Sequence, residues 1–145
     1  MREIITDIII DAPKEKIWAL LTDFDNYSNW NSFITKAKGT PSSGRTVKIK
    51  VRANNVTLPT ITAKIRIAEE NKELSWGGPD NALASKIVGA DHYFQIEELS
   101  DNQCRFIHGE RFYGILPMLT WKVIAASKPG YLAMNQEIKE QAEMA

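Results

Sequence analysis

Apolar and polar residues alternate along much of the chain that precedes Ile115, with the two-residue period of strands buried on one face. The clearest case lies between Thr46 and Arg52, where Val47, Ile49 and Val51 alternate with polar, mostly basic residues. This pattern predicts a sheet with one dry face and one wet face. Strands are expected at residues 4–10, 33–38, 46–52, 60–69, 74–76, 92–96 and 104–112.

Helical spacing replaces the alternation in the C-terminal run from Ile115 to Glu143. Leu119, Val123 and Ile138 belong to a broad apolar stripe, which predicts a long amphipathic helix. Because Pro129 removes a backbone donor, this helix should kink or split there. Two short helical segments are expected after the first strand, at 14–22 and 23–27. We therefore expect an α+β fold in which a curved antiparallel sheet of about seven strands wraps around the long C-terminal helix.

The last two strands form the most informative local pattern. Even-numbered positions from His92 to Ile96 share one face of the first strand, and those from Cys104 to Phe112 share one face of the next. If the turn centres near Asp101, the facing residues lie about 4.5–5.5 Å apart at Cβ. The predicted pairs are Ile96 with Phe106, Phe94 with His108, and His92 with Glu110. Two histidines and a carboxylate would then point inward.

Composition narrows the range of partners. The formal net charge is zero and charges of both signs are interspersed, so nucleic acid is not expected as a partner. Cys104 is the only cysteine and there is no zinc-type Cys/His spacing, so we expect no disulfide, no metal and no cofactor. The first residues enter a strand pattern without signal-peptide features, and no apolar run reaches the roughly 18 residues of a spanning helix. We expect one cytoplasmic domain, residues 1–145, with no stable membrane insertion.

Several segments in a fixed order resemble one known superfamily. They are IDAPKEKIW (10–18), FDNYSNWN (24–31), GADHYF (89–94), FIHGERFYG (106–114) and YLAMN (131–135). In this order they resemble the START-like helix-grip (SRPBCC) superfamily, within it the polyketide cyclase/dehydrase branch. Two features depart from its pattern: Ser32 stands where proline often follows the Trp-Asn pair, and Pro129 interrupts a helix that is usually smooth.

The resemblance implies a helix-grip fold with an apolar cavity between the sheet and the C-terminal helix. A hydrophobic small molecule or lipid is the partner that such a cavity implies. From the inward-facing positions and the aromatic clusters we select the candidate ligand-binding residues. They are Trp30, Asn31, Phe33, Ile49, Ile65, Trp76, His92, Phe94, Phe106, His108, Glu110, Phe112, Leu119, Val123 and Tyr131.

His92, His108 and Glu110 are also the candidate catalytic residues, and two roles fit them. A histidine oriented by a carboxylate can exchange protons with a bound carbonyl compound near neutral pH. The commoner role is structural, because buried polar groups must be paired and can tie strands to a helix, with Tyr131 or Asn135 as further partners. Trp30 and Trp76 also have two candidate roles each, as walls of a ligand site or as anchors of the core.

Three classes of function remain open at this point. The leading hypothesis is an intracellular carrier or sensor of an apolar molecule, because no catalytic motif is complete. The alternative is a cyclase or dehydratase that uses His92 and Glu110, with His108, for proton transfer. The third is a protein-interaction module with a vestigial cavity, in which the loop around Asp80 contacts a partner. Residues 77–85 are a candidate lid over the opening, and the sequence does not specify an oligomeric state.

Overall fold

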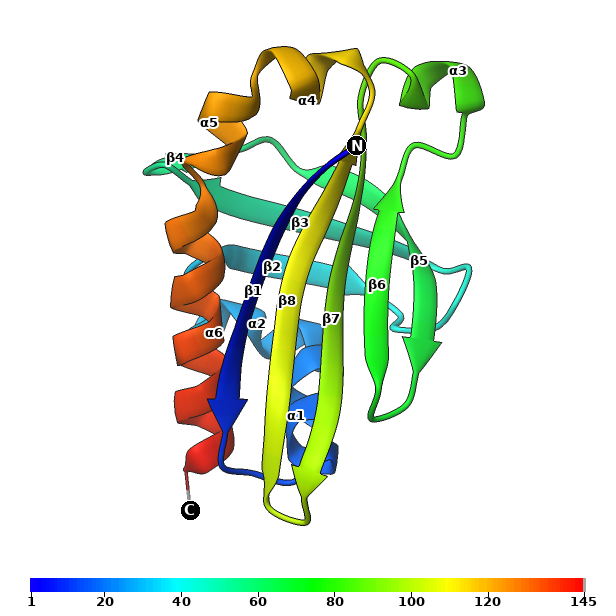
Figure 1. Ribbon diagram of the computed structural model, residues 1–145. Helices are drawn as coiled ribbons and strands as arrows, with labels where there is room; N and C mark the ends of the chain where they lie inside the picture. The colour runs from blue at the N-terminus through cyan, green and yellow to red at the C-terminus, as the bar shows by residue number, and fades with distance from the viewer. Residues whose placement is uncertain (145) are drawn as a thin grey trace.

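The computed structural model describes residues 1–144 and is organised around one strongly curled antiparallel sheet (Figure 1). Its strands follow the order β1-β8-β7-β6-β5-β3-β2, and the short β4 pairs only with β3. The strands are β1 (Arg2–Ile10), β2 (Ile34–Gly39), β3 (Thr46–Ala53), β4 (Val56–Thr57), β5 (Ile61–Glu69), β6 (Glu73–Gly78), β7 (Gly89–Ser100) and β8 (Gln103–Tyr113). The predicted α+β architecture is confirmed.

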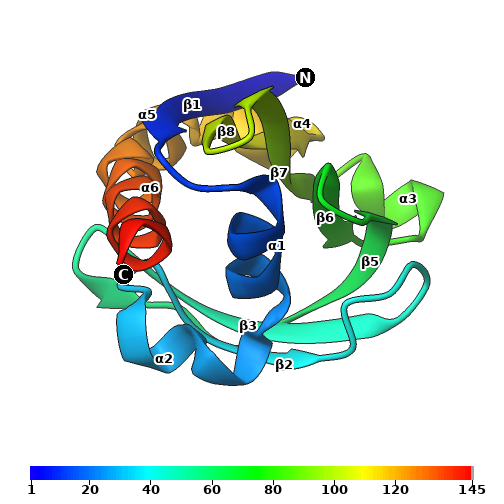
Figure 2. The same cartoon turned by 90° about the horizontal axis from the view of Figure 1, so that it is seen from below.

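Helices fill and close the curl of the sheet. Figure 2 shows α1 inside the curl and α6 along its open side, between β1 at one edge of the sheet and β2 with β3 at the other. The helices are α1 (Lys14–Thr22), the 3-10 helix η1 (Phe24–Asn26), α2 (Tyr27–Trp30), α3 (Ala82–Ser85), α4 (Ile115–Leu119), α5 (Trp121–Ala125) and α6 (Lys128–Glu143). The two short helical segments expected after the first strand are present, and α1 has the predicted bounds.

The predicted single helix from Ile115 to Glu143 is divided into α4, α5 and α6. The backbone leaves helical geometry at Thr120, with φ −109° and ψ 20°, and a second break precedes Lys128. Pro129 lies in the first turn of α6, where a missing N–H costs nothing because helices leave those donors unpaired. Proline therefore begins the last helix, and the predicted split is found just before it.

Irregularities in strand pairing help the sheet to curl. Register shifts occur between Ile34 and Lys36 on β2, between Ile65 and Ile67 on β5, and near Ser100 on β7. On β5 the shift ends the predicted alternation: Ile65 is buried, whereas Ile67 is 42% exposed. An extra residue in one strand turns the following side chains to the other face.

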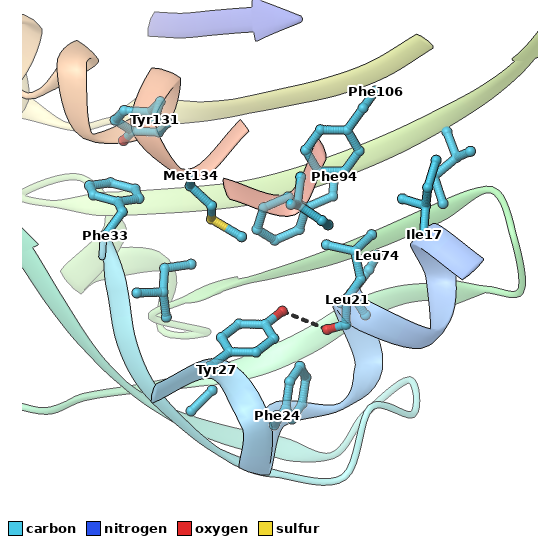
Figure 3. Packing of buried hydrophobic residues seen from close by; sticks show 14 of the residues in the cluster. Ile17, Leu21, Phe24, Tyr27, Phe33, Leu74, Phe94, Phe106, Tyr131 and Met134 are labelled. Carbon is cyan, nitrogen blue, oxygen red and sulfur yellow. Dashed lines mark hydrogen bonds between the residues drawn. The ribbon is translucent and has the colours of Figure 1, made fainter. Parts of the chain in front are cut away.

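The hydrophobic core lies at the lower end of the curl, where α1, α2 and α6 meet the sheet. Side chains from separate elements converge there, among them Ile17 of α1, Phe94 of β7 and Met134 of α6 (Figure 3). The buried hydroxyl of Tyr27 donates to the carbonyl of Leu21 at 2.5 Å, which satisfies its donor inside the core. With this end packed solid, any open volume must lie toward α4 and α5.

Candidate functional site

A cavity of about 790 Å³ lies between the upper half of the sheet and helices α4, α5 and α6. Apolar side chains from β3, β5, β8 and the three helices form most of its wall. Its volume falls within the roughly 300–1,000 Å³ that small-molecule sites occupy. Among the candidate ligand-binding residues, those that line it are Phe33, Ile49, Trp76, His92, Glu110, Phe112, Val123 and Tyr131.

The remaining candidates lie outside the cavity wall for identifiable reasons. Trp30 packs edge-on against Tyr27 at 5.4 Å, and Asn31 uses Oδ1 to accept the backbone N–H groups of Phe33 and Ile34 at 3.0 and 2.8 Å. Leu119 is 76% exposed because the break at Thr120 turns α4 away from the axis of α6. The core holds the other inward-facing candidates, Ile65, Phe94 and Phe106, and His108 lies behind His92.

Strand pairing places the polar residues at the inner end of the cavity. On neighbouring strands Trp76 faces His92 and His92 faces Glu110, so three side chains form a row across β6, β7 and β8. All three hairpin pairs predicted from alternation and a turn near Asp101 are found in this register. Because side chains on one face of a sheet share a direction, all members of the row reach the cavity.

Aromatic rings enclose the imidazole of His92. The Trp76 ring stacks on it with a centroid distance of 5.5 Å and an interplanar angle of 19°. Tyr131 of α6 also stacks on it, at 5.6 Å and 9°. Phe33, the residue before β2, completes the enclosure, and its ring centroid lies 4.6 Å from that of Tyr131. The enclosure holds the imidazole with its side chain only 6% exposed, so its ring nitrogens must be satisfied by protein groups.

Both ring nitrogens of His92 have such partners. Its Nδ1 lies 3.0 Å from Oε1 of Glu110, and its Nε2 lies 2.7 Å from Nε2 of His108. The Tyr131 hydroxyl donates to the same Oε1 at 2.6 Å. Glu110 is therefore held by one residue of β7 and one of α6, while its side chain stays 18% exposed at the cavity wall.

A second set of polar groups lies behind the histidines, away from the cavity. His108 Nδ1 lies 2.8 Å from Oδ1 of Asn135, whose Nδ2 donates to the Thr6 hydroxyl at 2.8 Å. Thr6 in turn donates to the carbonyl of His108 at 2.7 Å. The sequence analysis did not include Thr6. The feature that could have identified Thr6 is that it is a polar residue at an inward position of the first strand, between Ile4 and Ile8.

Burial controls the protonation of two members of this network. Complete burial, reinforced by the neighbouring His92, lowers the pKa of His108 well below its usual value, so this imidazole is neutral. Burial and the adjacent Glu110 carboxylate raise the pKa of the Tyr131 phenol, which therefore keeps its proton. Tyr131 is thus a fixed donor to Glu110.

The other end of the cavity opens to solvent between α4, the α3–β7 connection and the β3–β4 hairpin. The lining residues Val56, Val88, Leu116 and Val123 are all exposed there. The hairpin and α4 contribute lining that the sequence analysis did not predict, because it depends on how the helices break. Figure 1 places α3, α4 and α5 at the same end of the molecule. The backbone of Leu116 donates to Ile87 at 2.9 Å and ties α4 to this connection.

Two further residues of interest, Asp80 and Cys104, lie outside the cavity wall. Asp80, the proposed centre of a partner-binding loop, forms ion pairs with Lys64 and Arg66 on β5. Cys104 is buried and donates to the carbonyl of Ala12 at 3.5 Å, which is consistent with a small hydrophobic role. Burial raises the pKa of its thiol, so the nucleophilic thiolate is disfavoured.

Within residues 1–144, no three His, Cys, Asp or Glu side chains are grouped as a metal ion would require. Over the same residues, none of the helices has the length and apolar character needed to cross a membrane.

Comparison with known proteins places this geometry in context. The family model described as polyketide cyclase / dehydrase and lipid transport matches residues 1–133. No curated protein matches the chain at a significant level.

Solved structures share the fold at low sequence identity. The Zhui aromatase/cyclase from Streptomyces sp. R1128 superposes with a TM-score of 0.78 at 14% identity, covering 98% of this chain and 93% of that one. A point mutant of norcoclaurine synthase from Thalictrum flavum gives 0.71 at 9% identity, with 97% and 93% covered. A START superfamily protein from Mycobacterium smegmatis gives 0.70 at 15% identity, with 95% and 97% covered.

At these identities the structural likeness shows the helix-grip fold alone. The family model adds membership, because it spans nearly the whole chain, from β1 into α6. The chain therefore belongs to the polyketide cyclase/dehydrase and lipid transport family.

Proposed function

We propose that this protein binds a hydrophobic small molecule or lipid in the cavity between the sheet and helices α4–α6, as a carrier or sensor. The observation that carries the proposal is the cavity itself, about 790 Å³ with a mainly apolar wall and one polar end. Removing an apolar ligand from water into such a site is worth roughly 25 cal/mol for each Å² of apolar surface buried. The family description, which includes lipid transport, supports the same class of ligand.

The test is binding of the uncharged fluorescent probe N-phenyl-1-naphthylamine to the purified protein. Ala63 of β5 lines the cavity, and Ala63→Phe places a ring in the open volume. Its matched control is Ile67→Phe on the same strand, outside the cavity wall. We expect wild type and Ile67→Phe to bind the probe, and Ala63→Phe to bind at least about tenfold more weakly. Equal binding by both variants would place the probe elsewhere and contradict the proposal.

A second function is favoured by one specific observation: Glu110, Tyr131 and His92 meet at the cavity wall. A carboxylate there can take a proton from the carbon next to a bound carbonyl, leaving an enolate, and can return a proton to that carbon. This is the first step of cyclase and dehydratase chemistry on poly-carbonyl chains. The enzymatic alternative therefore uses Glu110 as base, His92 as its proton partner and Tyr131 as donor, with His108 positioned behind them.

Deuterium exchange into the methyl group of 2-acetonaphthone in D₂O tests this alternative. Proton NMR follows the loss of the methyl signal, and the enzymatic account expects wild type to accelerate it over buffer. Glu110→Gln should abolish the acceleration, whereas Glu97→Gln, on the exposed face of β7, should retain it. Exchange at the buffer rate with wild type, under conditions where the ketone is bound, would remove this chemistry and leave binding intact.

A further inference from the structure

The orientation of the Asn135 amide is fixed by Thr6. A carbonyl only accepts hydrogen bonds, so the Thr6 hydroxyl donates its single proton to the carbonyl of His108, at 2.7 Å. Its oxygen must therefore accept from Asn135, which places Nδ2 of the amide toward Thr6 at 2.8 Å. The amide oxygen is left facing Nδ1 of His108 at 2.8 Å.

This orientation determines which nitrogen of each imidazole carries a proton. Because the Asn135 oxygen only accepts, His108 Nδ1 is protonated, and in the neutral ring Nε2 is then a bare acceptor. The 2.7 Å contact between the two Nε2 atoms requires His92 to donate. His92 is therefore protonated on Nε2, and its Nδ1 points at Oε1 of Glu110.

One proton is shared between His92 and Glu110. The 3.0 Å contact between Nδ1 and Oε1 needs a donor, which is an imidazolium facing a carboxylate or a carboxylic acid facing a neutral imidazole. The two states differ only in the position of that proton. Tyr131 can donate to Oε1 in both, so the rest of the network does not rearrange.

The second carboxylate oxygen of Glu110 is free of this network. Over residues 1–144, Oε1 has the two partners already described, and no hydrogen-bond donor is found for Oε2. Among the residues that the structure describes, Glu110 lines the cavity and no lysine or arginine does. The inner end thus offers an acceptor to a ligand and lacks a cation that would hold a ligand carboxylate or phosphate.

Trp76 lies in the same wall but offers a ligand no donor. Its ring lines the cavity, whereas its Nε1–H is fully buried and has no acceptor among the described residues. A ligand group at Oε2 of Glu110 is therefore surrounded by a mainly apolar wall. A hydroxyl brings one donor, which Oε2 accepts, whereas an ammonium group brings three, most of which such a wall leaves unpaired.

From these contacts we infer that the cavity selects an uncharged apolar molecule bearing a hydroxyl, phenol or enol, which donates to Oε2 of Glu110. The inference rests on the proposed binding function and names its ligand class. Thr6, Asn135 and His108 act as positioning residues, because they direct the His92 proton arrangement without touching the ligand.

Four naphthalenes of similar size test the inference by displacing N-phenyl-1-naphthylamine from the wild-type protein near neutral pH. They are 2-naphthol, 2-methoxynaphthalene, 2-naphthoate and 2-(aminomethyl)naphthalene. We expect 2-naphthol to bind at least about tenfold more tightly than each of the others, since covering a hydrogen-bonding group on the ligand or at Oε2 without its partner costs about 1–3 kcal/mol. Glu110→Met should reduce the affinity for 2-naphthol to that for its methyl ether, 2-methoxynaphthalene. The control Glu97→Met should keep the preference.

The outcomes separate this inference from the proposed function. Equal affinity for 2-naphthol and 2-methoxynaphthalene overturns the inference and leaves apolar binding standing. Tighter binding of the naphthoate or of the amine also overturns it, because either implies a different charge at the inner end. Failure of the displaced probe itself to bind overturns the proposed function.

The proton arrangement has an independent test that needs no variant. The chain contains two histidines, so long-range ¹⁵N–¹H NMR correlations give the tautomer of each directly. We expect His108 protonated on Nδ1 with a bare Nε2, and His92 protonated on Nε2. If His108 were protonated on Nε2 instead, it would donate to His92, and the proton arrangement given above would be wrong.

Discussion

At the scale of single residues, burial decides which groups of this protein can carry charge. His108 is completely buried between His92, Asn135 and the Tyr131 ring, and its pKa is lowered well below the usual value. In the unfolded chain its pKa is about 6.5. The folded state therefore excludes a proton that the unfolded state binds, and this difference makes stability depend on pH.

The sign of that dependence gives a prediction. Stability from the neutral His108 is fully present above about pH 6.5 and is lost as the pH falls, by up to about 1.4 kcal/mol per unit. Urea unfolding at about pH 6.5, 6.0 and 5.5 measures the loss, because in this range the proton shared by His92 and Glu110 in the folded state has a counterpart on a histidine of the unfolded chain, and most carboxylates stay ionised. An NMR titration in which the folded His108 ring gains its proton near pH 6.5 would contradict the account.

The tyrosines predict the opposite dependence at high pH. Burial raises the pKa of all four phenols, with a neighbouring carboxylate adding to the shift in each case. Above about pH 10 the unfolded chain loses phenol protons that the folded protein keeps, so stability falls as the pH rises. We expect phenolate absorbance to rise in one cooperative step together with loss of near-ultraviolet circular dichroism. Gradual ionisation near pH 10 in a folded protein would contradict this.

At the scale of elements, the join between α5 and α6 shapes the cavity. Gly130 lies so close to Phe33 that a Cβ at this position would stand 2.5 Å from Cδ1 of the ring. Phe33 lines the cavity and packs on Tyr131 at 4.6 Å. Glycine therefore allows the start of α6 to approach the wall, while Pro129 only sets the first turn.

Gly130→Ala is expected to destabilise the protein and weaken binding, because the phenyl ring must move into the cavity. Overpacking of this kind costs about 1–3 kcal/mol, against a gain of up to about 1 kcal/mol from helix propensity. The control Pro129→Ala should change the free energy of unfolding by less than about 1 kcal/mol. Denaturant unfolding and probe titration of both variants measure the effects. If Gly130→Ala is as stable as wild type and binds the probe with unchanged affinity, Gly130 does not have this role.

The same elements show how far sequence reasoning reached. Alternation predicted the inward faces of β7 and β8, because a shift by one residue would have exposed Phe94 and Phe106, while the turn placed near Asp101 predicted which residues pair. It did not predict the exposed Ile67, since the register shift on β5 depends on how the sheet curls. The break at Thr120 was missed as well, because a helical apolar stripe carries no information about the surface that the helix must follow.

At the scale of the whole molecule, the fold separates a packed end from an open one. Phe94, Phe106 and Met134 fill the curl around α1, while the open volume lies beneath α4 and α5. The aromatic and histidine positions could be predicted because they share inward faces of strands. The Asn135–His108 contact could not, since it joins a helix to a strand and depends on the tertiary arrangement.

The central claim is that the cavity holds an apolar molecule. Native mass spectrometry of gently purified protein, compared with its denatured mass and followed by solvent extraction, tests it most directly. The account predicts a discrete additional mass on wild type and on Ile67→Phe, extractable as an apolar hydroxyl-bearing compound and absent from Ala63→Phe. A bare protein mass for wild type, together with no binding of N-phenyl-1-naphthylamine, would contradict it.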